Sequence, residues 1–123
     1  MLQQVADYTR RWPFRMWGFG EGVALHGLLA AHRVTGDAKY FDFVRDLLRA
    51  YVARDVKKSN EEHIAPGTEL LLVYEKRGES YFLEAARQLA ALNASFPQNT
   101  FGARMHRPDM SGWRKQIWVD CRA

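Results

Sequence analysis

The chain has 123 residues, 47% of them hydrophobic and 26% charged, a balance that indicates one small globular domain and excludes a disordered protein. No apolar run approaches the roughly 18 residues that a membrane helix needs, and a single cysteine, Cys121, excludes a disulfide framework or a cysteine-rich zinc site within the chain. The net charge of +4 suits nucleic acid or a small anion, but the basic residues lie between apolar helical positions and no nucleic-acid-binding motif accompanies them. The first eleven residues lack the apolar core of a signal peptide, so we expect a cytoplasmic protein that binds neither nucleic acid nor membrane.

The first predicted helix covers residues 17–34 and is apolar on nearly every face, which is typical of a buried helix. Gly36 then provides a C-terminal stop, and Asp37 an N-cap for the next helix. That helix, residues 38–54, is amphipathic, because its apolar positions form one stripe and most of its charged residues lie off it. These segments predict a hairpin of one buried and one half-exposed helix.

Residues 70–92 repeat this plan. Residues 70–74 are apolar all round, Gly78 interrupts them, and residues 81–92 are amphipathic. The second copy lies 42 residues after the first, falling to 41 beyond a one-residue gap. A period in this range indicates stacked helical hairpins.

Stacked hairpins form either an open solenoid of the HEAT kind or a closed toroid with the buried helices in an inner ring. The alternation of fully apolar and amphipathic helices favours the toroid. We therefore predict an all-α fold of alternating inner and outer helices, with residues 1–123 as a single partial domain. A toroid of about six hairpins needs roughly 250 residues, so we expect an incomplete toroid: two hairpins, a long loop and the start of a third inner helix. Such a fragment should be inactive alone and prone to associate through its uncovered helices.

A segment rich in aromatic residues, Gly, Pro or carboxylates precedes each buried helix. These segments span residues 12–22, 60–67 and 96–120. Since the inner helices of such a toroid run in the same direction, we expect the three segments to meet at one mouth of the ring. Free N–H groups at helix N-termini favour an anionic ligand there, and aromatic faces beside carboxylates suit a sugar.

Each candidate residue also has a plain structural interpretation. Asp120 could cap the third inner helix, and Glu62 could be a first-turn carboxylate favoured by the helix dipole. Trp17 and Trp118 could be core aromatics. Spacing alone leaves these alternatives open.

The four histidines fall into two pairs. His26 and His32 lie inside the first helix, where we expect packing or solvent-exposed roles, whereas His63 and His106 lie on the predicted rim and are candidate ligand contacts. No pair of histidines has the spacing of a metal site, and the glycines in residues 18–22 do not follow a strand. We therefore expect neither a metal nor another cofactor.

Four stretches carry a resemblance to a known family. They are residues 17–22 (WGFGEG), 35–40 (TGDAKY), 62–67 (EHIAPG) and 118–120 (WVD). Together they resemble glycoside hydrolase families 88 and 105, the unsaturated glucuronyl and rhamnogalacturonyl hydrolases, in order and spacing over nearly the whole chain. The Thr-Gly-Asp turn occurs in many helical toroids, whereas Trp-Val-Asp after a Pro-Gly helix start is much more specific. The resemblance implies an (α/α)6 barrel.

The resemblance also implies a reaction on a small anionic oligosaccharide. Enzymes of this kind hydrate the C4–C5 double bond that a polysaccharide lyase leaves at the non-reducing end. An aspartate protonates C4 and assists water at C5, and the hemiketal opens with loss of the sugar. Asp120 occupies that position, and Glu62 stands where the family usually has a second aspartate. Trp118 matches the family's stacking tryptophan, and Trp17 or Phe19 the aromatic at the opening.

Two other functions remain open from the sequence. The first is another helical-toroid glycosidase or a sugar epimerase, either of which would act on saturated sugars. The second is a helical-repeat binding protein without catalysis, which would need no acid at Asp120.

Overall fold

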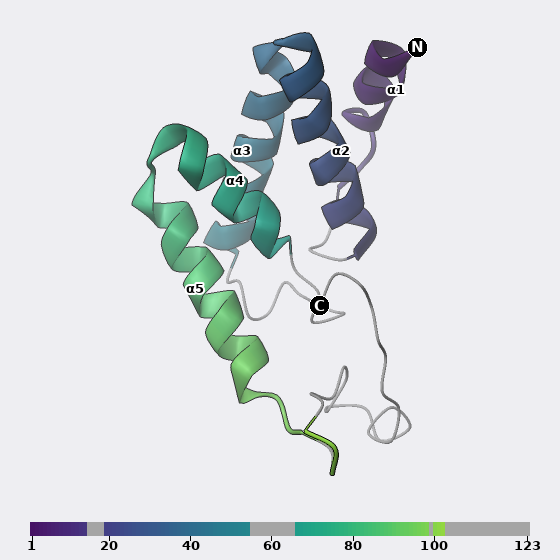
Figure 1. Ribbon diagram of the computed structural model, residues 1–123. Coiled ribbons are helices and arrows are strands. Elements are labelled where there is room, and N and C mark those ends of the chain that lie inside the picture. Colours follow the sequence, from purple (N-terminus) through teal and green to yellow (C-terminus); the bar gives the residue numbers. More distant parts are fainter. Residues whose placement is uncertain (15–18, 55–65, 99, 103–123) are drawn as a thin grey trace.

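The computed structural model describes residues 1–14, 19–54, 66–98 and 100–102, which form five helices (Figure 1). They are α1 (Leu2–Thr9), α2 (Phe19–Thr35), α3 (Ala38–Ala53), α4 (Gly67–Arg77) and α5 (Ser80–Ser95). These described residues contain no strand, which confirms the all-α class. None of the five helices combines the length and apolarity that crossing a membrane requires.

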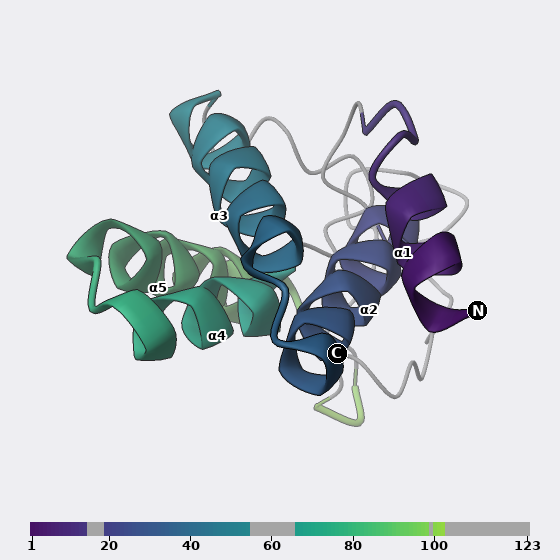
Figure 2. The ribbon, with the colours of Figure 1, turned by 90° about the horizontal axis from the view of Figure 1, so that it is seen from above.

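The helices are arranged as two hairpins, α2 with α3 and α4 with α5 (Figures 1 and 2). Helix α3 packs on both α2 and α4, so the hairpins share one apolar core. The largest fully buried side chains of this core come from α2, α3, α4 and α5. They are Leu25, Leu28, Tyr40, Val44, Leu48, Tyr51, Leu70, Val73 and Phe82. The predicted pair of hairpins is therefore present.

The turns of the two hairpins have the same backbone geometry, 42 residues apart. Gly36 has φ 73° and Gly78 has φ 70°, the left-handed region that glycine adopts without strain. Each glycine N–H donates to the carbonyl four residues earlier, Gly36 to His32 at 2.8 Å and Gly78 to Tyr74 at 2.6 Å. The sequence repeat is thus a structural repeat with equivalent helix ends.

Two glycine substitutions, one in a turn and one inside a helix, test the left-handed geometry assigned to Gly78. We expect Gly78→Ala to lower the free energy of unfolding by about 1 kcal/mol, because a Cβ is strained at positive φ. Gly27→Ala in the middle of α2 should raise it by about 0.5–1 kcal/mol, because no heavy atom lies within 4 Å of the added Cβ and alanine favours the helix. Urea titration of both variants measures the two changes, and a stabilising Gly78→Ala would contradict the assigned turn.

The buried positions of the two outer helices match at an offset of 41. They are Phe41, Val44 and Leu48 in α3, and Phe82, Ala85 and Leu89 in α5. Tyr40 and Tyr81, which the sequence repeat also aligns, differ: Tyr40 is buried, whereas Tyr81 is exposed and its hydroxyl donates to the Arg49 carbonyl at 3.3 Å. The apolar stripe of the repeat is therefore reproduced, except at the first tyrosine.

Helices α2 and α4 are buried on some faces only, although their apolar character on nearly every face is typical of buried helices. Val23 is 44% exposed, and Leu71 and Leu72 are 42% and 37% exposed. The reason is geometric, because the described neighbours of α2 and α4 cover only some of their faces. An apolar strip on each helix remains uncovered by the described residues.

Helix α1 was not among the predicted elements. Its larger apolar side chains, Leu2, Val5 and Tyr8, are exposed, and Ala6 is its one buried hydrophobic residue. Polar contacts with α3 supplement the packing of α1 on α2, including an ion pair of 3.1 Å between Lys39 Nζ and Asp7 Oδ1. Leu2, Val5 and Ala6 have the spacing of one helix face, so this helix could have been predicted from the sequence.

Candidate functional site

The N-terminal ends of α2 and α4 lie together. Gly22 and Pro66 are both buried, and a Cβ added to Gly22 would lie 3.8 Å from the Pro66 Cβ. Glu21 and Glu69 stand in the first turns of the two helices. Two of the three helix starts that the sequence places on one rim are therefore brought together.

The two helices are also parallel and in register. His26 Nδ1 of α2 lies 2.9 Å from Glu69 Oε1 of α4, and further along, His32 Nε2 lies 2.7 Å from Lys76 Nζ. Both contacts join residues separated by nearly the period of the repeat. Because the helices run the same way, their free N–H groups point toward the same end of the fold.

Most of the predicted site residues lie outside the described residues. These are Trp17, Glu62, His63, His106, Trp118 and Asp120. Phe19 is the first residue of α2, but the structure does not describe its side chain. In the sequence, Trp17 comes two residues before α2 and Glu62 four residues before Pro66, so both adjoin helix starts that do lie together.

A cavity of about 390 Å³ opens between α1 and the start of α2. Aromatic side chains line it, together with one carboxylate: Tyr8, Trp12, Phe14 and Glu21. Trp12 and Phe14 belong to the first predicted rim segment. The combination of aromatic faces and an acid is the one expected of a sugar-contacting surface.

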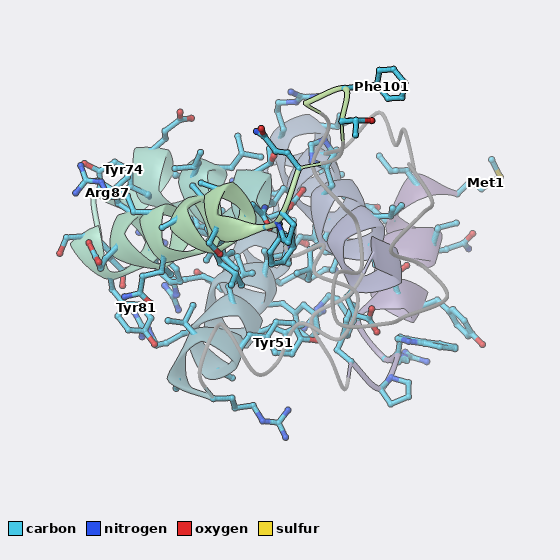
Figure 3. All side chains as sticks on the ribbon, turned by 90° about the horizontal axis from the view of Figure 1, so that it is seen from below. Met1, Tyr51, Tyr74, Tyr81, Arg87 and Phe101 are labelled. Atoms are coloured by element: carbon cyan, nitrogen blue, oxygen red, sulfur yellow. The ribbon has the colours of Figure 1, made fainter. Side chains whose placement is uncertain are left out.

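Tyr51 lies near the end of α3 (Figure 3), close enough to Glu21 for the charge of that carboxylate to act on its phenol. Burial raises the pKa of its phenol to about 12, and the negative charge of Glu21 acts in the same direction, while Arg54 partly opposes it. The folded protein therefore favours the neutral phenol, and the stability that this contributes is lost as the pH rises from about 10 towards 12. At neutral pH Tyr51 cannot serve as a base at the rim.

The His26–Glu69 pair is a polar contact that sequence reasoning missed. Glu69 is a buried carboxylate, whereas the His26 side chain is 46% exposed. Because a carboxylate only accepts hydrogen bonds, Nδ1 of His26 carries the proton, which leaves Nε2 on the far side of the ring. The pair spans two helices far apart in the sequence, so no local motif identifies it.

The hydrogen-bond partners of His32, the second histidine of α2, determine its tautomer in the same way. His32 Nδ1 lies 3.0 Å from the Asp37 carbonyl oxygen, which only accepts, so Nδ1 is the donor. Nε2 then accepts from the Lys76 ammonium. The ring therefore joins the far ends of α2 and α4 through both of its nitrogens.

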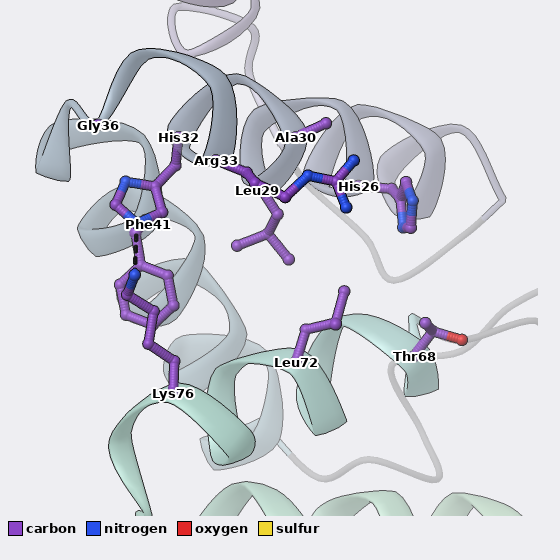
Figure 4. Close-up of a pocket in the computed structure, with 10 residues that line it drawn as sticks. All are labelled: His26, Leu29, Ala30, His32, Arg33, Gly36, Phe41, Thr68, Leu72 and Lys76. Atoms are coloured by element: carbon purple, nitrogen blue, oxygen red, sulfur yellow. Dashed lines mark hydrogen bonds between the residues drawn. The ribbon is translucent and has the colours of Figure 1, made fainter.

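Between these two polar contacts runs a groove of about 630 Å³ (Figure 4). Its apolar walls are Leu29 and Ala30 from α2, Leu72 from α4 and Phe41 from α3. Its polar lining is His26, His32, Arg33, Thr68 and Lys76. Within the described ranges, no group of three or more His, Cys, Asp or Glu side chains is placed to hold a metal ion.

Nearly the whole chain matches a known protein family. The family model for Glycosyl Hydrolase Family 88 matches residues 2–122. A search of the solved structures found no match. The family match includes both described hairpins and all the segments that the sequence places on the rim.

Proposed function

This chain belongs to glycosyl hydrolase family 88, and from that membership we propose that it acts in hydrating unsaturated uronic acids at the non-reducing end of lyase-generated oligosaccharides. The activity belongs to a full-length protein in which this chain supplies the first two hairpins and the start of the third inner helix of an (α/α)6 barrel. The meeting of the α2 and α4 starts, at Gly22 and Pro66, is the structural observation that carries the proposal. The 123-residue chain alone is expected to be inactive.

The uncovered apolar strips of α2 and α4 support the barrel. Val23 and Leu71 lie outside the core that the described helices share. Burying such side chains contributes about 25 cal/mol per Å² of apolar surface. Further hairpins of a closed ring would provide that burial, with α2 and α4 as inner helices and α3 and α5 as outer ones.

Asp120 is the acid in the proposed reaction. It protonates C4 of the unsaturated ring, and its carboxylate then accepts a proton from the water that adds to C5. The C5 hemiketal opens by breaking the bond from C5 to the ring oxygen, and the hemiacetal left at C1 releases the rest of the oligosaccharide. No covalent sugar–enzyme bond is needed, because hydration of the double bond makes the linkage unstable.

Glu62 stands in the position of a second carboxylate. A neighbouring negative charge raises the pKa of an acid that must hold its proton near neutral pH, and desolvation acts in the same direction. Glutamate is one methylene longer than the aspartate usual in the family, so its carboxylate reaches a different point. This difference bears on which uronic acid, and which linkage, the site accepts.

The aromatic residues and histidines of the rim are assigned to substrate binding. Trp118 stacks on the sugar ring and desolvates Asp120, and Trp17 or Phe19 forms the opposite side of the opening. His63 and His106 contact the polar groups of the substrate. The helix starts that these residues adjoin add positive potential, which suits the carboxylate of a uronic acid.

A comparison of substrates tests the proposed function. The full-length protein should remove the ultraviolet absorbance of the double bond from lyase-made oligosaccharides and release their terminal sugar. It should leave matched saturated oligosaccharides uncleaved, because these offer no double bond to protonate. Cleavage of the saturated set at a similar rate would identify a conventional glycosidase instead.

A further inference from the structure

The groove between α2 and α4 is cationic. Arg33 and Lys76 line it, and no aspartate or glutamate is among its described lining residues. Arg33 is exposed, and the described part of the chain offers it no carboxylate partner. The Lys76 ammonium is held by His32 and lies 5.4 Å from the centre of the Phe41 ring, so Lys76 contributes its charge at a fixed place.

His26 presents an oriented imidazole to the other end of the groove. Its Nδ1–H donates to the buried Glu69 carboxylate at 2.9 Å, which fixes the ring plane and directs Nε2 away from α4's carboxylate. Because Nδ1 carries the proton, Nε2 is left as an acceptor and takes a hydrogen bond from a ligand hydroxyl. A sugar ring supplies such hydroxyls.

Arg33 and His26 lie on the same side of α2. They are seven residues apart, which is two helical turns or about 10 Å. In Figure 4 the Arg33 side chain extends along α2 in the direction of His26. A guanidinium binds a carboxylate with two parallel hydrogen bonds, so this end of the groove is equipped for one such group.

The apolar walls fit the rest of a sugar ring. Leu29 and Leu72 face each other across the groove (Figure 4), so a pyranose could bind between them through its C–H faces. The volume of about 630 Å³ lies within the range of small-molecule sites. A groove that served only to pack another helix would leave the Arg33 charge to be buried without a described partner, which is costly.

We propose that the α2–α4 groove is a binding site for a uronic acid, with the sugar carboxylate on Arg33 and a sugar hydroxyl donating to Nε2 of the Glu69-oriented ring of His26. This inference rests on the proposed function, because it concerns the same class of substrate. It assigns Glu69 as a positioning residue, which acts through His26 and touches no ligand itself.

Binding of saturated glucuronate tests the proposal, with neutral glucose as the comparison. Glucuronate lacks the C4–C5 double bond and is not turned over, so this experiment and the substrate comparison above can fail separately. In NMR titrations, glucuronate should shift the ring signals of His26 and the methyl signals of Leu29 and Leu72, and glucose should shift them far less. Absence of glucuronate-dependent shifts, or equal shifts with glucose, would overturn the proposal.

Charge-matched variants locate the carboxylate. Arg33→Gln should weaken glucuronate binding about tenfold, the loss expected for one charge-assisted contact. Arg87→Gln removes the same charge from an exposed position on α5, away from the groove, and should leave the affinity unchanged (Figure 3). Equal losses in both variants would indicate non-specific attraction and overturn the site.

The role of Glu69 is tested by two substitutions. Glu69→Gln keeps an oxygen that accepts from His26 Nδ1, so the affinity should stay within about threefold of the original. Glu69→Leu removes the acceptor and should weaken binding about tenfold. The ring nitrogen signals of His26 should keep one tautomer in the glutamine variant and show a mixture in the leucine variant. Unchanged affinity and tautomer in Glu69→Leu would overturn the positioning role.

Discussion

Changing Asp120 to asparagine should lower the turnover of lyase-made oligosaccharides between about a hundredfold and ten-thousandfold, the range that one general acid contributes. Asparagine has the size of aspartate but no acidic proton to place on C4. The rate of loss of the double bond's ultraviolet absorbance, measured in the full-length protein, gives the change directly. Asp46→Asn on the exposed side of α3 is a matched control and should leave the rate unchanged.

The same substitution separates catalysis from helix capping. Asparagine and aspartate are about equally good N-caps, so a purely structural Asp120 would tolerate the change. The melting temperature should therefore remain close to that of the original protein while the activity is lost. An Asp120→Asn variant with full activity would remove Asp120 from the reaction and leave it as a cap.

Truncating Leu70 to alanine should lower the free energy of unfolding by about 2–5 kcal/mol, the usual cost of removing a fully buried leucine side chain. Leu70 is 0% exposed and belongs to the core that both hairpins share. Since small domains are stable by only about 5–15 kcal/mol, this change removes a large share of the total. Urea unfolding followed by circular dichroism measures it.

Leu72→Ala is the matched control on the same helix. Leu72 is partly exposed on the groove side of α4, so its truncation should cost about 1 kcal/mol or less. Leu28, which aligns with Leu70 in the repeat and is also buried, should respond as Leu70 does. Equal effects at Leu70 and Leu72 would contradict the assigned core.

The hairpins could be predicted from the sequence because their signals are local. Gly36 and Gly78 end α2 and α4 with the same left-handed geometry, and the apolar stripe that begins at Phe41 recurs at Phe82. Such signals depend on the periodicity of a helix and on the conformations open to glycine. Both can be read without knowledge of tertiary packing.

The contacts between hairpins could not be predicted in this way. His26 was expected to have a packing or solvent-exposed role, yet it donates to Glu69, which lies 43 positions further along the chain. Val23 and Leu72 belong to helices with the apolar character of buried helices, yet both are partly exposed. Apolar character alone gives no information about which faces the neighbouring helices cover. The sequence repeat predicted that α2 and α4 run in the same direction. Which side chains join the two helices across their groove depends on side-chain geometry, which the repeat does not give.

The candidate site was predicted more from resemblance than from physical pattern. Aspartate at position 120 and glutamate at position 62 have ordinary helix-start interpretations, and only the likeness to a family distinguished them. The family match supports the glycosidase assignment, and the contact between Gly22 and Pro66 supports a common rim. The roles of Asp120 and Glu62 remain predictions for the experiments above.

Hydration of the double bond is the central claim, and isotope labelling during turnover tests it most directly. With a lyase-made oligosaccharide in deuterated water, NMR of the earliest product should show one deuterium at C4 and no remaining double bond, because the proton that Asp120 delivers exchanges with solvent. Release of the terminal sugar with its double bond intact and no deuterium at C4 would mean direct cleavage of the glycosidic linkage and would contradict this account.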